Sequence, residues 1–289
     1  RLAKFRHAPD RFFADSRHPV LRAIVAVLAP PIMRSEWALG VLEDPLDTLA
    51  DSANPLVQSI AKRVTQRRAH EREHLLRSEN HPKVSVIMAA LNAAPTIAEA
   101  LDSLSAQSYR ALEIIVVDDG SDDATKEIVR AKMKNDPRIT LIEGGPKEGA
   151  AIARNRGLRA SQGAFLTFQD SDDISHPERI ERQLAALIAN DARVVVCNSM
   201  RETADGQRVI VNGRRFAKNF IAMLFPRDPV FNRIGYMRQL VVGEDSEYYE
   251  RLRASFGPTR EVHLFQTLYR ARFAPDSLLF SHGATEVDV

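Results

Sequence analysis

From Lys83 onward, short runs of apolar residues alternate with amphipathic segments. The runs are rich in Val, Ile and Phe, as strands buried on both faces are, and they occupy 83–90, 112–119, 138–143, 164–169 and 193–198. Two intervening segments place apolar residues on one helical face: Ile97, Leu101 and Leu104 in the first, and Ile180, Leu184, Leu187 and Ile188 in the fourth. Repeated strand–helix units predict an α/β fold with a mostly parallel sheet flanked by helices.

The two ends of the chain follow different patterns. Residues 1–80 contain helical segments joined by Pro-containing turns and no β-rich run, which predicts an N-terminal helical accessory region before a main domain at 81–289. Beyond residue 200 the strand–helix alternation weakens. There the sequence predicts a hairpin around Asp205 and Gly206, a helix over 244–256 and a last strand over 262–272.

Composition indicates a soluble globular protein and narrows its partners. The chain has 289 residues, 44% of them hydrophobic, and a formal net charge of +2, so no charge excess indicates nucleic acid as the main partner. The single cysteine, Cys197, excludes an internal disulfide and fits a reducing compartment. The apolar run 19–33 is interrupted by Arg22 and ends at two prolines, so it is too short to span a membrane. We expect it to pack on the main domain.

A basic helix predicted near 55–78 contains the stretch HEREH, His70 to His74. This stretch satisfies H-E-x-x-H, which places two imidazoles on one helical face, where they can bind zinc. A catalytic zinc site also needs a third protein ligand and apolar support, whereas nearly every neighbour of this stretch is charged. The sequence therefore favours a solvated helix over a metalloprotease site.

Acidic residues gather at the carboxyl ends of two predicted strands. Asp118 and Asp119 stand at the end of the second strand, and Asp170, Asp172 and Asp173 at the end of the fourth. Parallel sheets bind ligands at the carboxyl ends of their strands. Carboxylates this close repel one another unless a proton or a cation intervenes, and an Asp-x-Asp offers hard oxygen ligands to Mg²⁺ or Mn²⁺. The pattern predicts a divalent cation that carries a nucleoside diphosphate.

Part of each cluster also fits a purely structural role. Turn formation and helix capping account for Asp122 or Asp123, but not for a second acidic cluster at an equivalent place. Ser175 to Glu178 has the spacing of a capping box, which would hold the loop after the fourth strand at its far end.

Other phosphate-binding classes lack their sequence signatures here. The chain has no G-x-x-x-x-G-K-[ST] and no G-x-G-x-x-G after the first strand. A phospho-acceptor receiver domain also uses an acidic pair with Mg²⁺ and is the second class considered. Such a domain is shorter, and the fifth strand ends in Cys197-Asn-Ser without the lysine that a receiver places there.

Four stretches together resemble inverting family 2 glycosyltransferases of the GT-A fold. They are VSVIMAALNAAPTIAEALDSLSAQSY, EIIVVDDGSDDAT, GAAIARNRGLRASQGAFLTFQDSDD and VGEDSEYYERL, in the family's order and spacing over residues 83 to about 272. The resemblance implies a nucleotide-sugar-binding half at 81–200 and an acceptor half at 201–289. It implies a metal-dependent transfer of a sugar from a nucleoside-diphosphate sugar, with UDP favoured, to a hydroxyl acceptor.

The resemblance also assigns roles to residues. It implies that Asp119 contacts the nucleobase or ribose beside Asp118, that the backbone near Ala89 and Asn92 lines the same pocket, and that Arg154 steadies the nucleotide. The family's first-strand motif carries a proline and an aromatic or polar residue where Ala89 and its two successors stand. Side-chain contacts to the base are therefore not expected from that strand.

The remaining implied roles concern the metal and the chemistry. Asp170 and Asp172 match the Asp-x-Asp, with Asp170 also on the nucleotide side, and Asp245 matches the catalytic base, with Glu244 beside it. A base on the acceptor side is also what a single inverting displacement requires. The segment TLYRARFAPDSLLFSH resembles the family's closing segment and offers three contacts to the diphosphate: Arg270, Arg272 and His282.

The same resemblance suggests a setting. The Q-x-x-R-W motif of processive synthases is absent, so we expect the addition of one or few sugars. The opening KFRHAPDRFFADS resembles N-terminal segments of bacterial capsule and surface-polysaccharide transferases. That implies a glycan or lipid-linked glycan acceptor and a cytoplasmic location, at the inner face of the membrane if the N-terminal region contacts lipid or a biosynthetic complex. The alternative is a catalytically silent GT-A scaffold or glycan-binding module, which would not need five carboxylates in a cleft.

Overall fold

A computed structural model describes residues 66, 73, 81–211, 216–273 and 287–288. The predicted helical region 1–80, with the HEREH stretch and the run 19–33, lies outside the described residues except for two positions, and so does His282. The domain boundary at residue 80 stays a prediction. No described helix combines the length and apolar character that crossing a membrane requires.

The strand–helix units appear where the sequence predicts them. The first part of the described chain runs β1 (Val84–Ala90), α5 (Ile97–Ser105), β2 (Leu112–Asp118), α6 (Thr125–Asn135), β3 (Ile139–Glu143), α7 (Ala150–Ala160) and β4 (Phe165–Phe168). The second part runs β5 (Ile174–Ser175), α8 (Arg179–Ala189), β6 (Val194–Glu202), β7 (Arg208–Val211), β8 (Phe216–Pro226), α9 (Arg227–Ile234), α10 (Glu244–Phe256), β9 (Glu261–Arg272) and β10 (Val287–Asp288). The predicted hairpin, which joins β6 to β7, the helix over 244–256 and the last strand are all confirmed.

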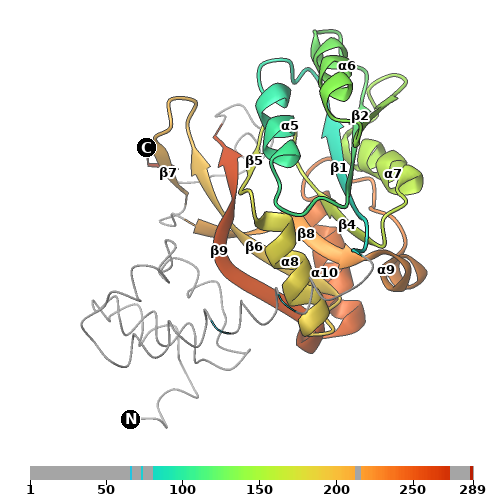
Figure 1. Cartoon of the computed structure of the whole chain (residues 1–289), viewed down its shortest axis with the longest axis vertical. Coiled ribbons are helices and arrows are strands. Elements are labelled where there is room, and N and C mark those ends of the chain that lie inside the picture. Colours follow the sequence, from blue (N-terminus) through green and yellow to red (C-terminus); the bar gives the residue numbers. More distant parts are fainter. Residues whose placement is uncertain (1–65, 67–72, 74–80, 212–215, 274–286, 289) are drawn as a thin grey trace.

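The sheet is mixed, which corrects the expectation of a mostly parallel one. Strands β3, β2, β1 and β4 are parallel neighbours in that order. Strand β8 then inserts antiparallel between β4 and β6, so the fifth predicted strand does not extend the parallel half. Strand β8 was not predicted, although its FIAMLF run is as apolar as the other strands. Figure 1 shows β8 and β6 crossing behind α8, with β9 curving along the edge.

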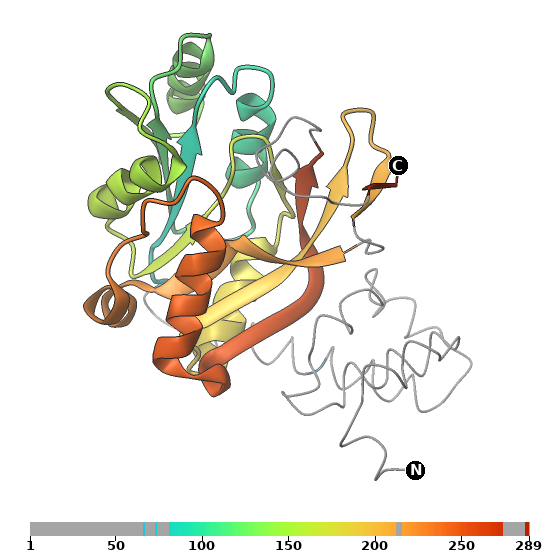
Figure 2. The same cartoon turned by 180° about the vertical axis from the view of Figure 1, so that it is seen from behind.

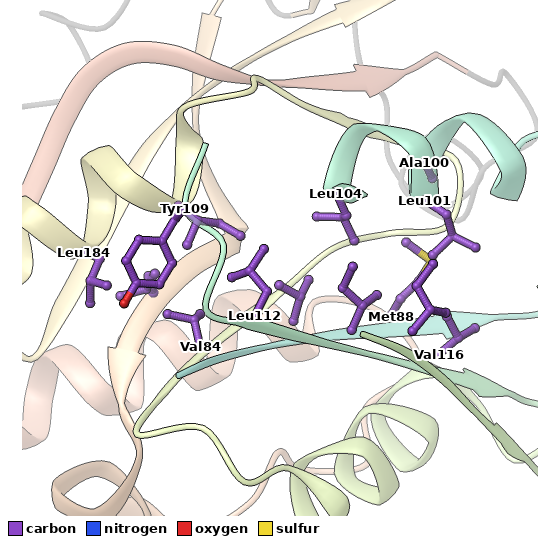
Figure 3. Packing of buried hydrophobic residues seen from close by; sticks show 14 of the residues in the cluster. Val84, Met88, Ala100, Leu101, Leu104, Tyr109, Leu112, Val116 and Leu184 are labelled. Carbon is purple, nitrogen blue, oxygen red and sulfur yellow. The ribbon is translucent and has the colours of Figure 1, made fainter. Parts of the chain in front are cut away.

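Alternation along β1 divides the core between two faces. Val84, Val86 and Met88 pack on one face with side chains of α5, α6 and α8, whereas Ile87 packs on the other with α7, α9 and α10. Figure 3 shows part of the first cluster, where Met88 meets Leu101 from α5 and Val116 from β2. Fully burying one such side chain stabilises the fold by about 1.5–3 kcal/mol. The two faces are seen separately in Figures 1 and 2, with α5 and α8 nearest the viewer in the first and α10 in the second.

Helix α7 packs on the sheet at Gly157, which faces Ile87 of β1. A Cβ at this position would lie 2.5 Å from Cγ2 of Ile87, so any larger residue would push the helix away. The close packing holds Arg154, one turn earlier on the same helix, near the carboxyl end of the sheet.

The predicted capping box before α8 is wrong. Ser175 belongs to β5, where it pairs with Tyr269 of β9, and its hydroxyl donates to Oε1 of Gln169. Helix α8 begins at Arg179 without a side-chain cap. The serine is extended because its backbone is part of a strand pair that the local sequence does not reveal. That pair still fixes the far end of the loop after β4.

Candidate active site

Three carboxylates lie together in the loop that leaves β4. One oxygen from each of Asp170, Asp172 and Asp173 can be chosen so that all lie within 4.8 Å of one another. Asp170 is half-buried, Asp172 is exposed and Asp173 is buried. The local sequence folds this way because β4 ends at Phe168 and the two-residue strand β5 begins at Ile174, which leaves only a tight turn between them.

Asp173 is used to anchor this loop to β9. Its carboxylate accepts the backbone N–H of Arg272 at 2.8 Å and the hydroxyl of Tyr269. The Tyr269 oxygen in turn accepts the backbone N–H of Asp170 at 3.0 Å. Burial, followed by repulsion from Asp172 and Asp170, raises the pKa of Asp173 well above its ordinary value. Because Asp173 anchors the loop, Asp170 and Asp172 remain as the pair of carboxylates that faces outward. Tyr269 positions this loop, a role that was not predicted from the sequence.

The outward pair suits a divalent cation. The pKa of Asp172 is raised, first by partial desolvation from surrounding protein atoms and then by repulsion from Asp170. The positive charges of Arg272 and Arg201 oppose this rise, and the side chain still reaches solvent. A cation between the two carboxylates would remove the repulsion. The donor set consists of carboxylate oxygens, which Mg²⁺ and Mn²⁺ prefer. The residues present therefore fit such an ion.

A buried arginine connects this loop to α10. Arg154 of α7 donates to Oδ1 of Asp170 at 2.6 Å and, through its other terminal nitrogen, to Oε1 of Glu244. Burial lowers the pKa of Arg154, but the carboxylates of Asp170, Glu244 and Asp245 outweigh it, so the pKa is raised overall. The guanidinium is permanently charged, and it brings residues 16 and 90 positions away in the chain into one cluster.

Asp245 stands in the first turn of α10, after Gly243 in a left-handed conformation (φ 80°). Its Oδ1 accepts the backbone N–H of Ser246 at 2.7 Å. Burial raises its pKa, attraction to Arg154 opposes the rise, and repulsion from Asp170 and Glu244 adds to it. Glu244 is committed to Arg154, whereas the described hydrogen bonds of Asp245 are local. Of the predicted pair, Asp245 is therefore the better placed to accept a proton from a bound molecule.

The acidic pair after β2 shapes the neighbouring loops. The carboxylate of Asp118 accepts the backbone N–H groups of Gly120 and Ser121, and that of Asp119 accepts those of Glu148 at 3.1 Å and Gly149 at 2.8 Å. Both aspartates are buried. The Asp118 carboxylate thus stabilises the turn after β2, and the Asp119 carboxylate joins this turn to the loop between β3 and α7. Their contact with a nucleotide stays a prediction.

Asn92 and Ala89 lie at the same edge of the sheet. Asn92 adopts a positive φ of 49°, and its side-chain oxygen accepts the backbone N–H of Asp122 at 3.0 Å. The β1–β2 register pairs Ala89 with Val117, one residue before the acidic pair. Helix α6 begins at Thr125 without a side-chain cap, so the predicted capping role of Asp122 or Asp123 is wrong. Asp123 instead stabilises the turn before the helix, because its carboxylate accepts the backbone N–H of Ala94 and of Thr125.

The two described arginines of the predicted closing segment separate. Arg272 acts on Asp172 through its charge. Arg270 lines a cavity of about 670 Å³ between α5, β5 and the ends of β6 to β9, and its side chain pairs with Glu202 at 3.3 Å. Of the two, Arg272 is the arginine whose charge acts on the carboxylate cluster.

The fold is that of GT-A glycosyltransferases. S. aureus TarS residues 1–349, in a crystal structure with UDP, align at a TM-score of 0.55 and 23% identity, covering 67% of this chain and 61% of that one. A mannosyltransferase from Pyrobaculum calidifontis, solved with GDP-Man and Mn²⁺, aligns at a TM-score of 0.54 and 20% identity, covering 77% and 70%. At these identities the likeness concerns the fold.

The family follows from the sequence match. The model of glycosyl transferase family 2 matches residues 85–242, more than half of the chain, and the chain belongs to this family. Succinoglycan biosynthesis protein ExoO of Rhizobium meliloti (strain 1021) is 36% identical over 143 residues, which are 50% of this chain and 39% of that protein. The chain spans less than half the length of the curated relatives that it matches.

Proposed function

We propose that this protein transfers a sugar, with inversion and with the help of Mn²⁺ or Mg²⁺, from a nucleoside-diphosphate sugar to a hydroxyl acceptor. The observation that carries the proposal is the single cluster formed by the Asp170–Asp172 pair, the Arg154 bridge and Asp245. In this cluster Asp170 and Asp172 would bind the cation, Asp245 would act as the base, and Arg154 lies between them. That pairing suits a displacement in which charge leaves on one side and a proton leaves on the other.

On the donor side, Asp170 and Asp172 would hold the cation, which supplies positive charge to the diphosphate as it departs. Tyr269 and Asp173 hold the loop on which Asp170 and Asp172 lie. Arg154 bonds Oδ1 of Asp170, and the other carboxylate oxygen would remain free to bind a cation.

On the acceptor side, Asp245 would take the proton of the attacking hydroxyl. The raised pKa makes it a stronger base than an ordinary aspartate, because protein atoms and neighbouring carboxylates disfavour its charge. Attraction to the guanidinium of Arg154 opposes this rise in the pKa of Asp245. Attack from this side, opposite the departing diphosphate, inverts the anomeric carbon.

The nucleotide would occupy the edge formed by the ends of β1 and β2, beside Ala89, Asn92, Asp118 and Asp119. UDP is the favoured nucleotide, in line with the UDP bound by TarS, while the archaeal neighbour was solved with GDP-Man. The name of ExoO supports a place in surface polysaccharide synthesis, with a glycan or lipid-linked glycan as acceptor at the cytoplasmic face of the membrane.

The second candidate is a silent GT-A module that binds glycans without transfer. It would not require the Asp170–Asp172 pair beside a base of raised pKa. Thermal unfolding with UDP, GDP, CDP and dTDP, each with and without Mn²⁺, separates the two. A ligand at about a hundred times its dissociation constant stabilises the fold by close to 3 kcal/mol.

The decisive variant in this assay is Asp172→Asn. We expect one nucleotide to stabilise the protein only with Mn²⁺, and Asp172→Asn to abolish that shift. Asp205→Asn makes the same chemical change on the exposed β6–β7 turn and should leave the shift intact. If none of the four nucleotides stabilises the protein in the presence of Mn²⁺, the transferase proposal fails and the silent module gains.

A further inference from the structure

The exposed large hydrophobic side chains of the described residues all lie in one short segment. They are Tyr236, Leu240, Val241 and Val242, with Val241 81% exposed and the others between 39% and 42%. We call residues 236–242 the apolar loop. It lies in the connection between α9 and α10, which Figure 2 shows in orange. Gly243 follows the loop, and the next residue is Glu244, which bonds Arg154 in the candidate active site. A contiguous exposed apolar patch marks a surface that meets a partner.

The base of the apolar loop is held firmly. The side-chain amide of Asn155 on α7 donates to the carbonyl of Met237 at 2.8 Å and accepts its N–H at 2.9 Å. Arg251 donates to the carbonyl of Tyr236 at 3.0 Å. The hydroxyl of Tyr248 donates to the carbonyl of Gly235 at 3.0 Å. These bonds fix residues 235–237, so the exposure of Leu240 to Val242 is a feature of a loop with an ordered base.

Two basic side chains lie at the apolar loop. The guanidinium of Arg159 lies 4.7 Å from the ring centre of Tyr236, and Arg238 is an exposed residue of the loop itself. Arg233, which precedes the loop, bonds the carbonyl of Ser255 near the end of α10 instead. Glu247 pairs with Arg238 but also with Arg251, so one negative charge is shared between two positive ones. Asp228 is the exposed acidic side chain of α9.

We propose that the apolar loop docks onto an anionic membrane surface. Aliphatic side chains at positions 240–242, a tyrosine at the base of the loop and Arg159 and Arg238 beside that base match a membrane interface, where acyl tails, glycerol and charged headgroups follow one another. Docking in this way would set the active-site side of α10 against the bilayer. The proposal concerns lipid binding by itself and does not depend on the transfer reaction, so either can fail without the other.

A single tryptophan in the loop reports on docking directly. The chain has one tryptophan, Trp37, so Val241→Trp in a Trp37→Phe background places the only indole at the loop tip. With vesicles of phosphatidylcholine and phosphatidylglycerol we expect a blue-shifted emission that brominated lipids quench. Lys134→Trp in the same background, on the exposed end of α6, is the matched control and should show neither effect. If the indole of the Val241→Trp variant stays unquenched on vesicles that bind the full chain, lipid binding lies elsewhere and the proposal is overturned.

Charge and apolar contributions are tested by vesicle sedimentation. Arg238→Gln should weaken binding about fivefold, which is the contribution of one basic residue near an anionic surface, whereas Lys134→Gln removes the same charge and should have little effect. Val241→Ser should weaken binding about tenfold. High salt should reduce the difference between Arg238→Gln and the unchanged protein.

Two results would reassign the loop to another partner. If the emission of the Val241→Trp variant shifts to the blue with rising protein concentration in the absence of vesicles, the partner is a second copy of the chain. If the unchanged protein binds neutral and anionic vesicles equally well, the arginines do not contribute to binding by attraction to anionic headgroups. Either result would overturn the proposal, and the nucleotide-dependent stabilisation described above would be unaffected.

Discussion

The bridge made by Arg154 can be tested by replacing it with an apolar residue of similar length. Arg154→Met removes two charge-assisted hydrogen bonds and leaves the carboxylate of Glu244, whose side chain is 12% exposed, without its cation. Breaking a buried pair by removing one partner costs about 3–5 kcal/mol. Asp170 is 36% exposed and can be rehydrated, so its bond contributes less. We therefore expect a loss of about 3 kcal/mol in the free energy of unfolding, at the lower end of that range.

The measurement is urea and thermal unfolding of the protein without nucleotide or divalent ions. A loss of this size should lower Tm by roughly 10 °C. Arg130→Met is the matched control, because the Arg130–Glu143 pair is about half exposed and should be worth less than about 1 kcal/mol. Combining Arg154→Met with Glu244→Met restores charge balance, so the double variant should lose much less than the two single variants together. If the losses add to within about 0.5 kcal/mol, the buried bridge does not exist as described.

Three further outcomes are expected. Asp245→Asn should reduce transfer by about 10²–10⁴-fold while leaving Mn²⁺-dependent nucleotide binding intact, and loss of both together would show a structural role instead. Hydrogen bonding to Arg138 lowers the pKa of Asp136 from 3.8 to about 2. The ionised carboxylate therefore contributes to the free energy of unfolding above pH 4, and this contribution disappears as pH falls from 4 to 2. Asp136→Asn should cost about 1 kcal/mol at pH 7 and nothing near pH 2, and a cost that does not depend on pH would contradict this origin. Gly157→Ala should destabilise the fold by about 1–3 kcal/mol in urea unfolding because of its contact with Ile87, and a neutral effect would show that α7 can shift.

Local patterns predicted much of the fold. Apolar runs bounded by turn residues located β1 to β4 and β6, and the helix over 244–256 matches α10. Strand β8 was missed because the alternation of strands and helices had already ended there. Its antiparallel insertion changed the sheet from parallel to mixed, since the neighbours of a strand are chosen by the whole chain path and not by its own residues.

The sequence alone also placed the carboxylates at the ends of β2 and β4, because a parallel sheet brings such ends to one edge. It did not separate their tasks. Asp173 looked like its neighbours, and only its burial against Tyr269 and the backbone of Arg272 shows that it anchors the loop. The local sequence gives no sign of this role, because Arg272 lies 99 residues beyond Asp173 in the chain and Tyr269 only three residues before Arg272.

What the sequence by itself determined is therefore the local periodicity, the family resemblance and the kinds of side chain at the edge of the sheet. The tertiary structure decided which charges meet. Judged by its neighbours in the chain, Arg154 could have been a solvated helix residue, yet it is buried between Asp170 and Glu244. Electrostatic interactions fall off with distance in space and are strongest where water is excluded. The packing of the whole chain therefore decides which charged residues become partners, and no local sequence pattern encodes that packing.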